Sequence, residues 1–527
     1  MPSRRWALVF LAGMFAAHTL AVIAYGHLRP ERMNIRGIDP VAYYAYFHSL
    51  YFDHDLDFAN QYELLGMGFV PYYTTATGRT SNHSSIGPAL ALAPFWLAAD
   101  VVARLGGWRA DGTTAPYHAA AFIGMGSYGL AALLLTGLWC MRRFGPWAGA
   151  WAAGLAWGMG PLLYYCFPLT LMPHALGAAA TALFFLAVES AQPPSKRSAA
   201  LGGAALGLAM LMRWQNALFV GYPMALSLGR IWGSTNRRGA ARTEAAYWAV
   251  LALAAAAAFS PQMAAWQLLF GKPFLVPQGK GYLVFGRFEI VKTLFSPHNG
   301  LLVWTPGVGL AAIGLLLAKR GARMAAAGLG VVLLAQLVLN SAALDWHGAW
   351  GFSSRRFTES TPIFAFGLGA WLTLRKKRQW RLGATALGVL LVLWNELFIF
   401  QFVFHLIAWD QPLTAHEIFG DKFHLGDSHF RRLMIDSAWD HFEAGNPGLA
   451  LQCIESAIAA DPGHDDIYEN EGLLYETAGH LPSAIVSYDH ALAIRPGCAR
   501  IAERRAKAEA ALAQQLGLPK KPVGSGQ

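Results

Sequence analysis

The chain has 527 residues, of which 55% are hydrophobic and only 14% charged, a balance that excludes an ordinary soluble enzyme and favours a polytopic membrane protein. Its formal net charge is +10, but the basic residues fall in short clusters between apolar stretches, a placement typical of cytoplasmic loops. We therefore expect these basic clusters to lie at a lipid bilayer, and we expect no nucleic-acid partner.

The first apolar run covers residues 6–25, follows Arg4 and Arg5, and lacks a small-residue cleavage site before His27. We interpret it as an uncleaved membrane helix with a cytoplasmic N-terminus. The other segments expected to cross are residues 117–141, 146–166, 174–191, 198–214, 216–232, 245–269, 300–318, 324–343, 357–374 and 383–406. The prediction is an all-α, multi-pass protein of about 11 transmembrane helices, with basic clusters on the cytoplasmic side.

Residues 86–105 are apolar but hold two prolines, Asp100 and Arg104, and counting them as a span would place Arg142 and Arg143 outside. We predict a helix that lies on, or dips into, the outer membrane surface. This topology puts every unusual polar stretch on the extracytoplasmic side: residues 26–85, 164–174, 213–216, 271–299 and 345–356. Such a gathering predicts a site at that face, whereas a transporter would place ionisable residues at mid-membrane.

The composition becomes soluble after Gln411, and similar residues recur 34 positions apart, as in Pro462 and Pro496 or Gly445 and Gly479. This is the tetratricopeptide period, which predicts a small α-solenoid. The expected organisation is a membrane domain at 1–410 with a first outer loop at 26–116, a linker at 411–430, tetratricopeptide repeats at 431–515 and a disordered tail at 516–527. We expect the repeats to be extracytoplasmic and to dock a protein partner or a second copy; a stabilising appendage is the alternative.

The first outer loop opens with "DPVAYYAY", in which aromatic and apolar residues repeat at helical spacing. Pro40 suits the first turn of that helix and Asp39 its N-cap, and simple capping is one interpretation of Asp39. The same loop contains "FDHDLDF", whose clustered carboxylates suggest a metal site. That interpretation is less favoured, because the loop lacks the glycine and distal glutamate of an EF-hand.

Together with the first-loop stretch, "GRTSNHSSIGPALALAPFWLAAD", "MRWQNALF", "FSPHNGLLVWTP" and "LDWHGAWGFSSRRFTESTP" resemble the GT-C class of glycosyltransferases. These polytopic enzymes use polyprenyl-phosphate sugars and include protein O-mannosyltransferases and the aminoarabinose transferase of lipid A. The resemblance covers about residues 1–405. It implies an inverting transferase of the bacterial inner membrane that moves a sugar to an extracytoplasmic glycolipid, glycan or protein. A non-enzymatic scaffold recruiting envelope proteins through its repeats is the alternative, and a transporter is less favoured.

The resemblance implies that Asp39 is the general base or orients the acceptor, although Pro40 stands where many relatives have an acidic residue. It also implies substrate contacts at Asp55, Asp57, Glu63, Arg79, Asn82, His83, Arg213, Gln215, Trp346, His347, Arg355 and Arg356. Arginine suits the donor phosphate because its planar fork binds two oxygens, while the tryptophans, Trp350 included, could stack on a sugar. Interfacial anchoring is the alternative for these arginines and tryptophans. No cofactor is expected, with a divalent metal as the less favoured alternative.

Overall fold

The computed structural model describes residues 3–28, 34–67, 72–166, 171–191, 194–279, 281–349 and 351–517. The chain divides into two compact units, Met1–Glu396 and Leu397–Gln527. Over the described ranges the regular structure is helical, without a named strand, and two isolated β-bridges join Thr74 to Thr80 and Leu283 to Ala343. The all-α prediction is thereby confirmed.

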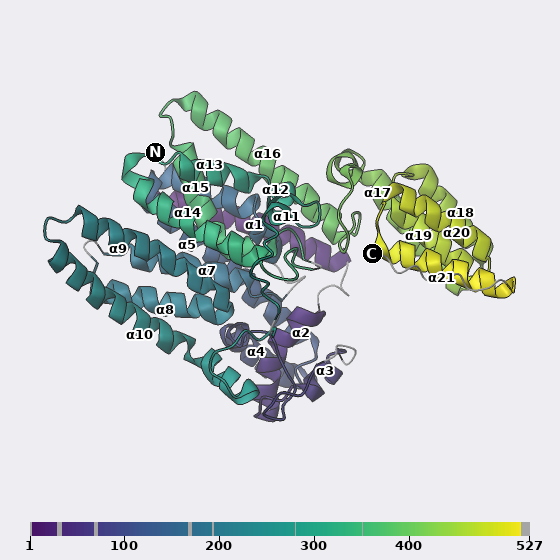
Figure 1. Ribbon diagram of the computed structural model, residues 1–527, viewed down its shortest axis with the longest axis horizontal. Helices are drawn as coiled ribbons and strands as arrows, with labels where there is room; N and C mark the ends of the chain where they lie inside the picture. The colour runs from purple at the N-terminus through teal and green to yellow at the C-terminus, as the bar shows by residue number, and fades with distance from the viewer. Residues whose placement is uncertain are drawn as a thin grey trace. The chain divides into compact units, whose positions relative to one another are not determined.

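The first unit contains the helices up to α16, all of which except α6 are labelled in Figure 1. Their bounds are α1 Arg4–Leu28, α2 Ile38–His48, α3 Ala59–Leu64, α4 Gly87–Gly106, α5 Ala115–Gly158, α6 Leu162–Tyr165, α7 His174–Val188, α8 Lys196–Met212, α9 Gly221–Gly233, α10 Arg237–Phe270, α11 Ile290–Phe295, α12 Leu301–Trp304, α13 Gly307–Leu316, α14 Arg320–Ser341, α15 Thr361–Leu372 and α16 Arg378–Val403. The last of these runs across the boundary between the units.

Within the described residues, 6 helices are long and apolar enough to cross a membrane: α1, α4, α5, α10, α14 and α16. The helices α7 and α13 are apolar but shorter. The predicted total of about 11 spans stays a prediction. So does the surface position of α4, which by length and composition is one of the six.

The long helix α5 turns back at Gly145, where the backbone takes a φ of 83° that favours glycine. Its two halves lie side by side, because a Cβ on Gly149 would be 2.3 Å from the backbone nitrogen of Met141, and one on Gly137 would be 3.7 Å from the Cβ of Ala153. The predicted segments 117–141 and 146–166 are therefore separate helices up to residue 158, and the basic pair at 142–143 lies at the turn between them.

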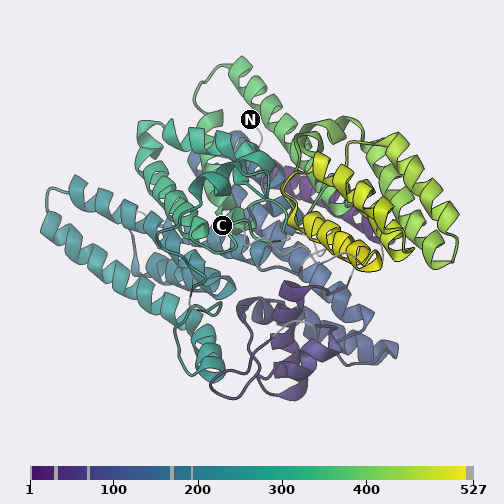
Figure 2. The same cartoon turned by 45° about the vertical axis from the view of Figure 1, so that its right-hand side comes forward.

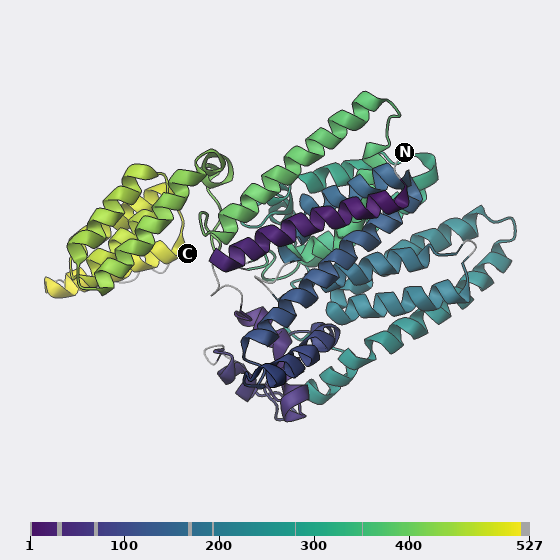
Figure 3. The ribbon, with the colours of Figure 1, turned by 180° about the vertical axis from the view of Figure 1, so that it is seen from behind.

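The core of the first unit forms where α5, α7 and α15 meet. Trp139 of α5 is fully buried and stacks on Phe185 of α7 with ring centroids 4.7 Å apart, and it contacts Phe366 of α15 at 5.3 Å. Glycines let neighbouring helices approach closely: a Cβ on Gly207 of α8 would lie 2.4 Å from the carbonyl oxygen of Ala255 in α10. Figure 2 shows α10 beside α8 and α9, and Figure 3 shows α1 packed along α5.

The second unit contains α17 Leu425–Glu443, α18 Pro447–Ala460, α19 Asp465–Thr477, α20 Leu481–Ile494 and α21 Ala499–Gln515. Consecutive helices pack on one another, as Figure 2 shows in green and yellow. Three pairs of positions that recur with the 34-residue period are fully buried: Ala450 and Ala484, Ile454 and Tyr488, Ala457 and Ala491. The period thus reflects equivalent core positions in successive helix pairs, while assignment to the tetratricopeptide class stays a prediction.

Candidate functional site

A polar cavity of about 230 Å³ lies in the first unit where α2 begins. Its lining comes from five separate parts of the chain, within residues 38–85, 172–174, 213–215, 278–282 and 345–356. All five belong to the polar stretches that were expected to share one side of the membrane. The fold therefore gathers these distant stretches around one cavity.

Asp39 reaches this cavity from the first turn of α2. Its Oδ2 accepts a hydrogen bond of 3.0 Å from Nη1 of Arg355. The helix begins at Ile38 with Gly37 as its N-cap, so the prediction that Asp39 caps the helix is wrong. The physical reason is the φ of 91° at Gly37, a conformation open to glycine that starts the helix two residues earlier. The first turn of α2 nevertheless holds Pro40, as predicted.

The ion pair between Asp39 and Arg355 sits at the rim of the cavity, with side chains that are 38% and 17% exposed. Burial acts to lower the pKa of the Arg355 guanidinium, but the charge of Asp39, together with weaker contributions from neighbouring groups, holds that pKa above its ordinary value. Burial, and then the charge of Asp39, raise the pKa of Tyr43, which also lines the cavity. Tyr43 is therefore a neutral phenol there, able to donate a hydrogen bond.

Arg356 is held on another side of the cavity. Its Nη2 lies 2.6 Å from Oδ1 of Asp345 and donates a hydrogen bond of 2.7 Å to the hydroxyl of Tyr282. Burial acts to raise the pKa of Asp345, but the charge and hydrogen bond of Arg356 outweigh it and hold that pKa below its ordinary range. Asp345 is thus an ionised partner that fixes the guanidinium of Arg356.

A third arginine, Arg213, enters the cavity from the end of α8. Its Nη1 lies 3.3 Å from Oε2 of Glu359, and Nδ1 of His174 lies 3.0 Å from Oε1 of the same carboxylate. The Glu359 side chain is only 2% exposed. A buried carboxylate needs such partners, and in return it anchors Arg213 and His174 at the cavity wall.

The backbone at Gly351 approaches these side chains closely. A Cβ on Gly351 would lie 2.7 Å from Cδ of Arg355 and 2.9 Å from the hydroxyl of Tyr165, so only glycine fits there without a shift. Ala349 and Ser353 have φ values of 52° and 54°, in the left-handed region that costs non-glycine residues free energy. The backbone at Ala349, Gly351 and Ser353 therefore favours the position in which Arg355 and Arg356 line the cavity.

The charges of the lining fit an anion. Three guanidinium groups from two distant segments line a cavity whose two carboxylates, Asp39 and Asp345, are each engaged by an arginine. A phosphate group would accept several charge-assisted hydrogen bonds from such a set. Because arginines already engage both carboxylates, the lining suits an anionic ligand better than a metal ion.

A separate apolar groove of about 780 Å³ runs between α13, α14 and α15. Its lining includes Leu302, Val308 and Leu337, and it extends to Phe357, the residue that follows Arg356 in the chain. Arg323 is the one charged residue among those that line it in the described part of the chain. The groove has the size and apolar character of a site for a hydrocarbon chain.

Comparison with solved structures finds the crystal structure of ArnT from Cupriavidus metallidurans bound to undecaprenyl phosphate, with a TM-score of 0.50, 14% sequence identity, and coverage of 93% of this chain and 80% of that chain. This chain has the fold of ArnT. The apo ArnT structure aligns with a TM-score of 0.48 at 14% identity, over 97% of this chain and 81% of that one. No protein-family model matches the sequence, and a search of curated proteins finds no match.

Within this ArnT-like fold, the cavity brings together six of the residues that were expected in the site: Asp39, His83, Arg213, Gln215, Arg355 and Arg356. His83 is oriented by a contact of 2.6 Å between its Nδ1 and the carbonyl oxygen of Pro277. Their roles in binding or catalysis stay predictions.

The acidic stretch "FDHDLDF" lies outside the cavity lining and stabilises its own loop. Asp55 accepts a hydrogen bond of 2.6 Å from the hydroxyl of Ser49, and Oδ1 of Asp57 accepts one of 3.2 Å from the backbone N–H of Thr80. Burial acts to raise the pKa of Asp57, but hydrogen bonds, Thr80 first among them, hold it below its ordinary value. Asp55 and Asp57 thus shape the loop; their expected contact with an acceptor stays a prediction.

Five further expected site residues also lie away from the lining: Glu63, Arg79, Asn82, Trp346 and His347. Asn82 is fully buried and Arg79 is half-buried, and each donates to a backbone carbonyl at 2.8 Å and 2.9 Å respectively. Glu63 is exposed on α3. These placements favour structural roles for Asn82 and Arg79.

An aromatic cluster is formed by Trp346, His347 and His298. Its first two members follow Asp345, a residue that lines the cavity, in the chain. The rings of His298 and His347 stack with centroids 4.3 Å apart, and Trp346 meets His347 edge-on at 5.3 Å. Trp350, which was expected to stack on a sugar, lies outside the described residues.

Sequence reasoning missed the acidic and phenolic partners of the arginines: Glu359, Asp345, Tyr43 and Tyr282. Two of them could have been predicted, because Asp345 and Glu359 both lie in the stretch "LDWHGAWGFSSRRFTESTP". A carboxylate next to an apolar segment needs a cationic partner, and this requirement could have identified both residues from the sequence. The phenols carried no such signal.

Proposed function

We propose that this protein is an inverting glycosyltransferase that moves a sugar from a polyprenyl-phosphate donor to an acceptor outside the cytoplasm. The observation that carries the proposal is the cavity in which Asp39 and three arginines meet. The ArnT fold supports it, since the ArnT structure was determined with undecaprenyl phosphate bound, and ArnT is a polyprenyl-phosphate-dependent GT-C glycosyltransferase. The proposed location is the bacterial inner membrane.

The donor would occupy the polar cavity and the apolar groove of the first unit. Its phosphate would lie on Arg355 and Arg356, with Arg213 as the third cation, while its isoprenoid chain would occupy the groove that extends to Phe357. This arrangement is supported by the adjacency in the chain of Arg356, which lines the cavity, and Phe357, which lines the groove. Trp346, which lies outside the cavity lining but follows the lining residue Asp345 in the chain, is the proposed platform for the sugar.

In the proposed reaction the acceptor hydroxyl or amine attacks the anomeric carbon of the sugar. The carbon–oxygen bond to the phosphate breaks, and polyprenyl phosphate leaves with the electron pair while the arginines stabilise its charge. Asp39 takes the proton of the acceptor, a task for which its position at the rim of the cavity suits it. Attack opposite to the leaving phosphate inverts the configuration at that carbon.

The second unit is proposed to serve the enzyme as a docking domain. Its paired helices bury the periodic positions of the sequence and leave polar helix faces for a partner protein or a second copy. We propose that it lies on the same extracytoplasmic side as the cavity.

The test compares transfer with and without the protein. Purified full-length chain in liposomes is supplied with a polyprenyl-phosphate sugar and an envelope extract, and mass spectrometry follows new glycosylated products. The expected result is product formation that depends on the chain, and envelope glycans that change when it is deleted. If glycans are unchanged by its loss, but deletion of residues 430–515 releases envelope proteins from the membrane, the chain is a scaffold instead.

A further inference from the structure

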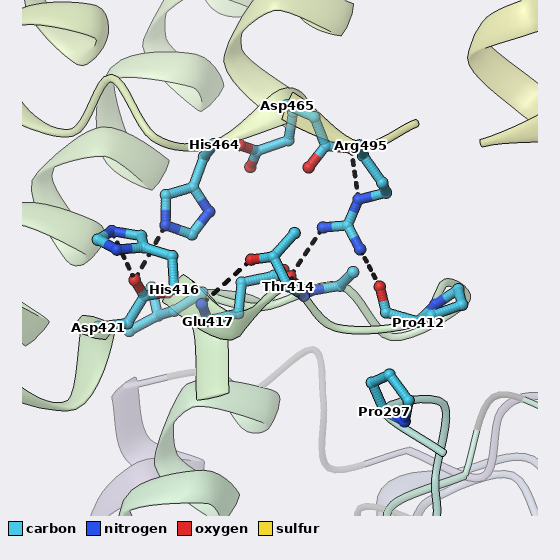
Figure 4. A network of polar contacts seen from close by, with 12 residues as sticks. Pro297, Pro412, Thr414, His416, Glu417, Asp421, His464, Asp465 and Arg495 are labelled. Carbon is cyan, nitrogen blue, oxygen red and sulfur yellow. Dashed lines mark hydrogen bonds and ion pairs between the residues drawn. The ribbon is translucent and has the colours of Figure 1, made fainter. Parts of the chain in front are cut away.

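Two histidines of the second unit converge on one buried carboxylate. Nε2 of His416 lies 3.2 Å from Oδ1 of Asp421, and Nε2 of His464 lies 3.1 Å from the same oxygen. Figure 4 shows both rings directed at Asp421 from different segments of the chain. The three donor atoms lie within 4.8 Å of one another, and no other described group of histidine, cysteine and acidic residues is arranged in this way.

A fourth side chain, Asp461, completes the group. One of its oxygens lies 3.6 Å from Nε2 of His416 and the other lies 3.3 Å from Nε2 of His464. Two ligands bound at about 2.1 Å to a tetrahedral zinc ion are about 3.4 Å apart. The four contacts between a histidine Nε2 and a carboxylate oxygen span 3.1 to 3.6 Å, close to that spacing, and those to Asp461 use both of its oxygens.

An independent observation also points to a ligand. The Asp421 side chain is completely buried, and its Oδ2 has no hydrogen-bond partner among the described residues. A buried carboxylate oxygen that is left unpaired costs free energy, which a cation held by both oxygens of Asp421 would remove. The histidines reach Asp421 through Oδ1, so they do not satisfy this oxygen.

The charges around the four side chains are compatible with a divalent cation. With neutral imidazoles, the four side chains carry two negative charges, and the guanidinium of Arg431 lies near the group, with its Nη1 3.6 Å from Asp461. That guanidinium is shared with Asp466 at 3.5 Å and with the carbonyl oxygen of Leu406 at 2.6 Å. The ammonium of Lys422 donates two hydrogen bonds of 2.8 Å, to Gln401 and to the carbonyl oxygen of Ile418.

We propose that His416, Asp421, Asp461 and His464 bind a zinc ion. Imidazole nitrogen and carboxylate oxygen in tetrahedral arrangement are ligands that Zn²⁺ favours. The ion connects residues 416–421 to the turn between α18 and α19, segments 43 positions apart in the chain. The ion would therefore fix the segment that precedes the helix pairs. In the same segment, Glu417 contacts Arg495 and accepts a hydrogen bond from the backbone N–H of Thr414.

The test uses the full-length protein in detergent, freed of its affinity tag and stripped with a chelator. After dialysis against zinc chloride and removal of the excess, mass spectrometry of the elements counts bound zinc, and calorimetric titration gives the affinity. We expect about one zinc per chain and a higher melting temperature with zinc. His416→Ala should lower the affinity at least about 100-fold, since even changes around a metal ligand cost 10- to 100-fold.

His416 is the informative position because its side chain is 46% exposed, so its replacement leaves the buried core intact. His464→Ala is the second variant, and the matched control is His480→Ala, an exposed histidine in the turn before α20. The control should bind zinc like the unmodified protein. Absence of zinc binding at micromolar concentrations, or binding that survives His416→Ala, would overturn the proposal and leave the four residues as a hydrogen-bonded network. The result does not depend on glycosyl transfer.

Discussion

Replacing Arg355 with alanine separates its role in binding a phosphate from its role in stability. The substitution removes the partner of Asp39, whose side chain is 38% exposed, so water can take the place of the guanidinium. The cost in unfolding free energy should therefore be near the 1 kcal/mol of an exposed ion pair rather than the ~3–5 kcal/mol of a buried one. The fold should persist.

Donor use should suffer far more than stability. A hydrogen bond between charged groups contributes about 1.5–3 kcal/mol, and 1.36 kcal/mol corresponds to a factor of ten, so kcat/KM for the polyprenyl-phosphate sugar should fall about 13- to 160-fold. Arg355→Lys should recover part of this loss, because it restores the charge but not the planar fork. The assay is transfer of a labelled sugar in liposomes over a range of donor concentrations.

The matched control is Arg109→Ala, which removes an arginine that also pairs with an aspartate, at 3.4 Å, but is 79% exposed and lies outside the cavity lining. Its kcat/KM should equal that of the unmodified protein. Equal activity of Arg355→Ala and Arg109→Ala would refute the reasoning that the cavity arginines bind the donor phosphate.

Three further outcomes are expected. Glu359→Ala should lower the melting temperature by several degrees and reduce transfer, because it leaves Arg213 unpaired and such losses cost about 3 kcal/mol; an unchanged unfolding curve would contradict this. Asp57→Ala should cost about 1 kcal/mol of stability with donor KM unchanged, and a large rise in KM would instead place Asp57 at the donor. The pKa of Asp345 is lowered in the folded state, so its pairing with Arg356 stabilises the fold above the unfolded pKa of about 4 and is lost as the pH falls through the folded value. Acid unfolding of Asp345→Asn should therefore be less steep below pH 4 than that of the unmodified protein, and identical slopes would exclude the linkage.

The helices could be predicted because their signals are local. Apolar runs give the helix positions, and the break in α5 follows from Gly145 and Pro146 beside a basic pair, a combination that favours a turn. The N-cap of α2 could not be assigned in this way, since both Gly37 and Asp39 suit a cap and the choice depends on a backbone φ of 91°.

Six residues that line the cavity could be predicted, but the ion pairs and hydrogen bonds among them could not. Arg355 and Asp39 are 316 positions apart, and Glu359 is 185 positions from His174, so these contacts depend on how the helices pack. Residue type alone was also insufficient. Asn82 was expected to contact substrate, yet it is fully buried and donates a hydrogen bond to the carbonyl oxygen of Ala42. Polar side chains that stabilise a loop and polar side chains that bind substrate have the same appearance in a sequence.

The most direct test of the account is the rate of sugar transfer by purified Asp39→Asn with a saturating polyprenyl-phosphate sugar. The substitution keeps the shape of the side chain but removes its capacity to take a proton. Loss of general-base catalysis predicts a fall in kcat of about 100-fold or more, with donor binding and melting temperature close to those of the unmodified protein. Transfer at the unmodified rate by Asp39→Asn would contradict the central claim that the carboxylate at the start of α2 activates the acceptor.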